Sequence, residues 1–113
     1  MTIEGFIIDA ISSVLEAPVY GDRPSPMPAR FHTVEKTGSR ETDHVQQATI
    51  VVQSWAESRN EAAALNELAK EAMRALIALP AISSVECETD YNYPDLTTRK
   101  PRYQALFNVV FFL

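Results

Sequence analysis

Three carboxylate side chains occur at alternate positions of one segment: Glu86, Glu88 and Asp90. Alternate residues of an extended strand point to the same side, so these three would share one face and could in principle bind a divalent cation through oxygen ligands. Basic residues that could neutralise them follow across the predicted hairpin: Arg99, Lys100 and Arg102. We therefore predict a solvated or lumen-facing strand surface here rather than a metal site.

The other side chains capable of chemistry lack partners in the sequence. His32 falls in a predicted strand and His44 in a polar loop, and neither has a second histidine or a cysteine at ligand spacing, so we expect both on the surface. Cys87 lies on the same side of its strand as Val85, which predicts a small buried hydrophobic residue rather than a nucleophile. The three glycines are too scattered to form a phosphate-binding loop. We expect no catalytic residue, cofactor or metal, and hence no enzyme.

Size and charge narrow the class of protein further. The chain has 113 residues, 46% of them hydrophobic and 22% charged, which is typical of one soluble folded domain, here residues 1–113. Its net charge of −5 argues against affinity for nucleic acid or for anionic membrane surfaces. A single cysteine suits a reducing compartment. The first apolar stretch follows no basic residue and is interrupted by Asp9, so we expect neither a signal peptide nor a membrane span.

Hydrophobic spacing predicts the elements that position these side chains. Apolar residues at three-and-four spacing predict one helix over residues 3–15 and a second from the capping pattern of Ser58 and Glu61 to Pro80. Alternating or β-branched runs predict five strands, of which the first is short and the third central: residues 18–21, 30–36, 45–55, 82–91 and 102–113.

The segments between these elements predict loops, and the whole predicts a fold class. Residues 22–28 contain three prolines and predict an exposed loop, whereas the polar residues 37–44 predict a long hairpin loop or flexible arm. The predicted fold class is α+β, with two helices packed on one face of a mixed, mainly antiparallel sheet of four to five strands.

The last predicted strand carries apolar side chains on both faces. Its second face holds Leu106, Val110 and Phe112, which water would reach if the helices cover only the other face. Burying each of them contributes roughly 1.5–3 kcal/mol. Two interpretations remain open at this point: the first helix packs on these side chains, or they form a subunit interface.

Short motifs along nearly the whole chain are similar to those of one family. The segment Arg30–Gly38 resembles the pattern R-F-x-T-V-x-R-T-G-G of small tail-assembly proteins from long-tailed phages and prophages, especially those of actinobacterial hosts. Lys36 and Ser39 depart from it, where the family has arginine and glycine. Three later segments agree in order: Gln53–Ala56, Tyr91–Asp95 and Pro101–Gln104. The chain thus resembles the tail terminator proteins, also called tail completion or head-tail joining proteins, of non-contractile phage tails.

The resemblance implies a structural virion protein that forms a homo-oligomeric ring, hexameric in the family, at the head-proximal end of the tail. Such a ring stops polymerisation of the tube and joins it to the head connector. The implied partners are copies of the chain itself, the major tail tube protein, connector or stopper proteins, and DNA that passes through without specific binding, with no membrane involved. Assembly would take place in the host cytoplasm. The interface residues expected on this basis are Leu106, Val110, Phe112, Arg30, Phe31 and Arg40. Those expected to face the channel are Glu86, Glu88 and Asp90.

Two other functions remain as alternatives. Another neck component, a head-completion or stopper protein, shares the small size and ring symmetry, and its position in the particle would distinguish it. A small ligand-binding module on a ferredoxin-like sheet would instead show a pocket and stabilisation by a small molecule. Concentration-dependent assembly without a ligand would favour the ring.

Overall fold

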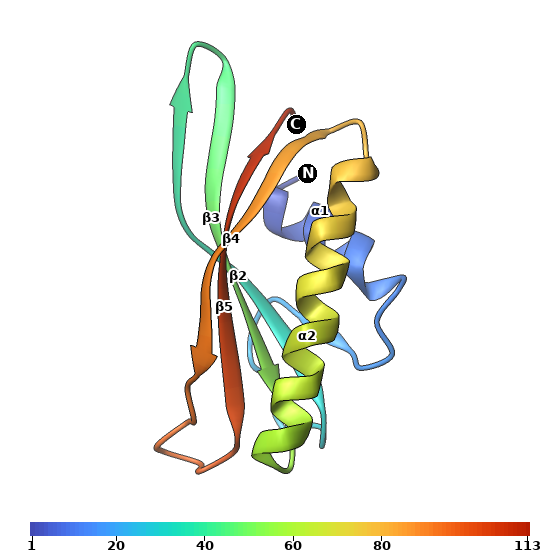
Figure 1. The fold of residues 1–113 in the computed structure, drawn as a ribbon, viewed down its shortest axis with the longest axis vertical. Coiled ribbons are helices and arrows are strands. Elements are labelled where there is room, and N and C mark those ends of the chain that lie inside the picture. The colour runs from blue at the N-terminus through green and yellow to red at the C-terminus, as the bar shows by residue number, and fades with distance from the viewer.

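The protein folds into two layers, a twisted five-stranded sheet and helices that cover one of its faces (Figure 1). The computed structural model describes all residues from Met1 to Leu113, in an elongated shape of 43 × 25 × 23 Å. The elements along the chain are α1 (Ile3–Ser12), β1 (Val19–Tyr20), β2 (Phe31–Thr42), β3 (Val45–Trp55), α2 (Arg59–Ala75), the 3-10 helix η1 (Leu76–Ala78), β4 (Ile82–Asn92) and β5 (Arg102–Phe111).

The sheet is mixed and mainly antiparallel. Its strand order is β1-β2-β3-β5-β4, in which only the short β1 runs parallel to its neighbour. The predicted α+β class is therefore confirmed. The central position predicted for the β-branched strand β3 is confirmed as well, because β3 pairs with β2 on one edge and with β5 on the other.

Side-chain caps start both long helices. The Thr2 hydroxyl accepts a hydrogen bond from the Gly5 amide at 3.0 Å, and the Ser58 hydroxyl accepts one from the Glu61 amide at 3.1 Å. Each cap satisfies an amide that has no partner inside its helix. α1 ends at Ser12, three residues before the predicted end, and the amides of Val14 and Leu15 both donate to the Ile11 carbonyl in the turn that follows.

The main core lies between the helices and the sheet. From α1 it takes Ile3, Ile7 and Ile11, and from the strands it takes alternate residues such as Ile50, Val52, Phe107 and Val109. The intervening strand residues point to the opposite side, which we call the uncovered face. Because α1 packs on the same side as α2, it does not cover Leu106 and Val110, and that interpretation of the apolar second face is wrong.

The predicted loop over residues 37–44 is mostly strand. β2 continues to Thr42 and pairs with β3 down to Val45, so the two strands project as a long hairpin at the top of Figure 1. Asp43 and His44 form the tip with φ of 51° and 68°, a left-handed turn that matches the twist of a hairpin. The register shifts between Lys36 and Gly38, which accommodates one extra residue as a β-bulge. Pairing with β3 therefore overrides the polar composition of this segment.

Candidate functional site

The four segments that carry the family resemblance meet at one end of the sheet. They lie at the start of β2, the end of β3, the end of β4 and the start of β5. Antiparallel pairing places Phe31 opposite Trp55, and Trp55 opposite Arg102. The Ala56 amide also donates to the Pro101 carbonyl at 3.2 Å. Motifs scattered over the sequence thus form one continuous structure, seen at the bottom of Figure 1.

Aromatic rings stacked around one arginine form the centre of this structure. The Phe31 and Trp55 rings are stacked with centroids 5.2 Å apart, and Tyr20 meets Phe31 edge-on at 6.0 Å. The Arg102 guanidinium lies 4.8 Å from the centroid of Trp55 and 4.4 Å from that of Tyr93, both within cation-π range. Its Nε also donates to the Tyr93 carbonyl at 2.7 Å. We call these five residues the aromatic end.

A row of polar side chains crosses four strands of the uncovered face beside the aromatic end. The Thr33 hydroxyl donates to Gln53 Oε1 at 3.2 Å, and Gln53 Nε2 donates to Gln104 Oε1 at 2.8 Å. Gln104 Nε2 in turn donates to the Tyr91 hydroxyl at 2.6 Å. Linked amides of this kind hold one another in a single arrangement, so this part of the face is a fixed polar surface.

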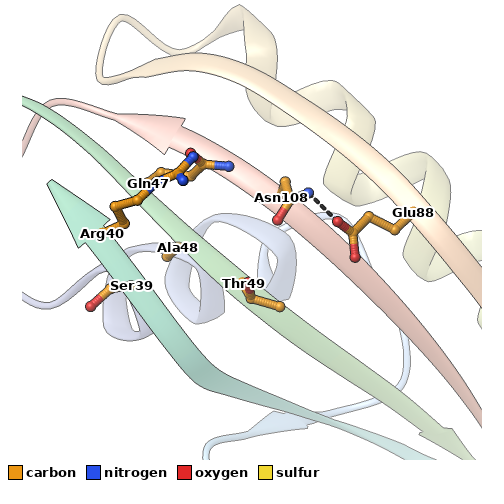
Figure 2. Close-up of a pocket in the computed structure, with 7 residues that line it drawn as sticks. All are labelled: Ser39, Arg40, Gln47, Ala48, Thr49, Glu88 and Asn108. Atoms are coloured by element: carbon orange, nitrogen blue, oxygen red, sulfur yellow. Dashed lines mark hydrogen bonds between the residues drawn. The ribbon is translucent and has the colours of Figure 1, made fainter. Parts of the chain in front are cut away.

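Farther along the same face lies an open polar hollow of about 370 Å³, shown in Figure 2. Arg40 Nη2 donates to Gln47 Oε1 at 2.8 Å on one side of it, and Asn108 donates to Glu88 on the other. Its lining is almost wholly polar: Ser39, Arg40, Gln47, Ala48, Thr49, Glu88 and Asn108. The hollow is suited to hydrogen bonds with another surface, and it lacks the apolar walls of a small-molecule pocket.

The predicted interface residues differ widely in exposure. Phe112 is 56% exposed, and Arg30 and Arg40 are also exposed. Leu106 and Val110 are half-buried on the uncovered face, Leu106 between Val51 and Thr89 and Val110 between Gln47 and Ser84. Phe31, by contrast, is fully buried beneath its own chain, so its side chain holds the aromatic end together and has no surface to offer a partner.

The three predicted channel-facing carboxylates do not share one face. The register of β4 on β5 shifts between Cys87 and Thr89, and this β-bulge reverses the alternation of side chains beyond it. Glu86 and Glu88 lie on the uncovered face, whereas Asp90 points under α2. The prediction that Asp90 belongs with the other two is therefore wrong. The same shift moves Tyr91 onto the uncovered face, where its hydroxyl meets Gln104.

Asp90 joins β4 to α2. Its Oδ2 accepts from Lys70 Nζ at 2.9 Å and from Asn66 Nδ2 at 2.8 Å. The hydrogen bond from Lys70 holds the pKa of Asp90 below its usual range, and the same bond raises the pKa of Lys70. The interactions of this half-buried carboxylate therefore hold α2 against β4.

Removing the Asp90 interactions with Asn66 and Lys70 should destabilise the fold. Asp90→Ala leaves the buried Asn66 amide without its acceptor and leaves Lys70 only its ion pair with Glu67, so we expect the free energy of unfolding to fall by about 1–3 kcal/mol in urea denaturation. Glu88→Ala is the control, since it removes an exposed carboxylate from the same strand, and it should change the free energy by less than about 1 kcal/mol. Equal losses in the two variants would contradict the assignment.

The buried pair of His32 and Ser54 is the one feature here that looks like a catalytic arrangement. His32 Nδ1 lies 2.9 Å from Ser54 Oγ, the geometry of a general base beside a hydroxyl nucleophile. Both side chains are fully buried, so no substrate reaches them. Burial lowers the pKa of His32 to about 4, which keeps the ring neutral at pH 7. The expectation that His32 lies on the surface is wrong; His44, at the hairpin tip, is exposed.

The remaining candidate residues have structural surroundings. Cys87 lies against the main core, as Val85 does, but it is only partly buried, whereas a buried side chain was predicted; this burial raises the pKa of its thiol. No three His, Cys, Asp or Glu side chains are grouped so that they could hold a metal ion. Neither helix combines the length and the hydrophobicity that a membrane span needs.

The chain matches no protein-family model and no curated protein. Its function is therefore argued from the arrangement of the aromatic end and the uncovered face. Trp55 and Tyr93 enter the sequence analysis only as parts of motifs, and Arg102 only as a motif residue and a possible neutraliser of the β4 carboxylates; the structure places Arg102 against the Trp55 and Tyr93 rings instead. The signal that could have identified them was an aromatic residue in each of the four motifs and an arginine in two of them.

Proposed function

We propose that the protein is a structural subunit of the tail terminator type, which forms a ring at the head-proximal end of a non-contractile phage tail. The convergence of the four motif segments carries the proposal. Residues that share a pattern with this family are far apart in the chain, yet they pack around Arg102 and Trp55 as one unit. The contacts among the four segments explain why their motifs occur together in one sequence.

The uncovered face supports an assembly role. A sheet with helices on one side leaves its other side for water or for a neighbour, and here that side combines a fixed polar row with the apolar Leu106, Val110 and Phe112. Polar groups held in place with apolar side chains between them are typical of a protein-protein interface. We assign this face to contacts within the ring or with the tube, except for its edge along β4, where Glu86 and Glu88 lie and which we assign to a lumen through which DNA slides without being bound.

In this proposal the work is mechanical. The ring docks on the last ring of the tube, covers its growing edge and presents a surface to the connector or stopper protein of the head. Its partners are further copies of the chain, the major tail tube protein and the connector, in a virion assembled in the host cytoplasm. Binding alone accounts for each step, and no covalent bond is made or broken.

The test is the growth of tail tubes in the presence of this protein. Mixed with the tail tube protein encoded in the same genome, it should shorten the tubes and label one end in electron micrographs. Phe112→Asp should abolish the effect by placing a charge in the interface, because burying an unpaired carboxylate is costly. Ile77→Asp, which changes an exposed apolar residue of η1 in the helix layer, is the control. Unchanged tube lengths with no protein at the tube ends would overturn the proposal.

A further inference from the structure

An apolar side chain stands exposed on a fixed loop at the aromatic end. Leu96, between β4 and β5, is 88% exposed. Its loop is held by hydrogen bonds from the Asp95 amide to the Lys100 carbonyl at 3.2 Å and from the Arg99 amide to the Asp95 carbonyl at 2.7 Å. The Asp95 carboxylate also accepts from the Thr98 hydroxyl at 2.5 Å. The loop therefore presents Leu96 in a set position, which lowers the entropy lost on binding.

Positive charge surrounds this loop. Basic residues occur in or next to the segments that meet at this end: Arg23, Arg30, Arg59, Arg99, Lys100 and Arg102. Two of them are paired there, Arg23 with Asp95 and Lys100 with Glu57. Arg99, three residues from Leu96, is exposed and makes no ion pair within the chain. The protein as a whole has a net charge of −5, so a concentration of basic residues at this end is unusual for the chain. A partner for the loop should therefore offer an apolar recess beside carboxylates.

The groove between the two long helices has that chemistry. It encloses about 240 Å³ and is lined by Val14, Leu15, Leu68, Glu71, Ala72 and Ala75. Val14 and Leu68 are 66% and 49% exposed, so the groove is unfilled apolar surface within its own chain. Its volume is below the roughly 300–1,000 Å³ of small-molecule sites and suits an inserted side chain.

Negative charge lies beside the groove. Glu71 lines it, and Glu16 follows directly after Leu15. Residues 1–20 contain three acidic side chains and no lysine or arginine. The groove and the loop are therefore complementary in charge, and each offers apolar surface to the other.

We propose that the Leu96 loop of one copy inserts into the α1-α2 groove of the next copy. This contact rests on the proposed function, in which copies of the chain assemble, and it names the surfaces that meet. Leu96 fills the apolar groove while Arg99 faces Glu71. Because loop and groove are different surfaces of one chain, every copy can use both, and a repeated contact of this kind closes into a ring when its rotation allows.

Self-association and crosslinking test this contact. Leu96→Ser and Leu68→Ser should each raise the dissociation constant of self-association by about tenfold or more, as expected for one leucine left in water. Leu96 and Leu68 are 88% and 49% exposed, so each variant should still fold. In a Cys87→Ala background, a mixture of Leu96→Cys and Leu68→Cys proteins should form a mixed disulfide. The control is Ile77→Ser, which removes an exposed apolar side chain outside the groove and should leave the dissociation constant unchanged.

The outcomes separate this contact from the ring itself. If Leu96→Ser associates as tightly as the wild type and no mixed disulfide forms, this contact is overturned while self-assembly stands. If the wild type stays monomeric up to about 1 mM, the weak limit of specific affinity, and the two cysteine variants form no mixed disulfide, the contact is overturned as well. Binding to tube ends would then still decide the proposed function. Charge reversal adds a direct check: Arg99→Glu should weaken association, and Glu71→Arg in the same chain should restore it.

Discussion

Phe31→Ala should lower the free energy of unfolding by about 3–5 kcal/mol, the largest stability effect that we expect from one substitution in this chain. The Phe31 ring is fully buried, stacked on Trp55 and met edge-on by Tyr20, so its removal leaves a cavity that these rings cannot fill. Trp55 is the only tryptophan, and its fluorescence in a urea titration reports on this end of the molecule directly.

Phe112→Ala provides the matched control for this loss. The same ring is removed, but Phe112 is 56% exposed at the end of β5, so the change in free energy should stay within about 0.5 kcal/mol. A loss for Phe31→Ala no larger than that for Phe112→Ala would mean that the aromatic end does not stabilise the fold. The pair also separates two roles that the sequence had grouped together, since both phenylalanines were predicted at an interface.

Local signals in the sequence were sufficient for most of the fold. The spacing of isoleucines in α1 and the capping pair Ser58 and Glu61 depend only on neighbours along the chain, and both helices begin where these signals indicate. The β-branched run of β3 predicts a central strand, and β3 does pair with β2 along one edge and with β5 along the other. These elements were predicted correctly because their determinants are local.

The predictions that were wrong concern residues whose positions depend on pairing between distant strands. The bulge near Cys87 shifts the register by one residue, which no alternation of residue types reveals, and it carries Asp90 to the other face. The polar residues of the hairpin likewise become strand only because β3 continues beside them. Burial of His32 is also set by distant segments, because in a regularly paired part of β2 it faces the helices and lies opposite Ser54 of β3.

The candidate site shows the same division between local and long-range information. The motifs around Phe31, Trp55 and Arg102 could be read from the sequence, and so could their order. Their convergence could not, because it depends on which strands pair: β5 lies beside β3, although β4 separates them in the chain. The exposure of Leu96 is also set by the loop's hydrogen bonds and not by its residue type.

The stability of the protein should fall as the pH drops from about 6.5 to about 4, and His32 should be the main cause. In the folded state burial lowers its pKa to about 4, while the unfolded chain has the ordinary value of 6.5. Above pH 6.5 the His32 ring is neutral in both states, so it makes no contribution to the pH dependence of the free energy of unfolding. Below it the unfolded state takes up the proton first, so the free energy of unfolding should fall by about 3 kcal/mol across this interval.

Urea titrations at a series of pH values measure this slope. His32→Asn removes the titrating ring, so its stability should vary less between pH 6.5 and 4 than that of the wild type, whatever its stability at pH 7. His44→Asn is the control, because His44 is exposed at the hairpin tip and should leave the slope unchanged. The lowered pKa values of Asp90 and Asp95 make these carboxylates lose their contribution only below the usual carboxylate value of 3.8, outside the interval. A slope that persists in His32→Asn would show that a different group takes up the proton.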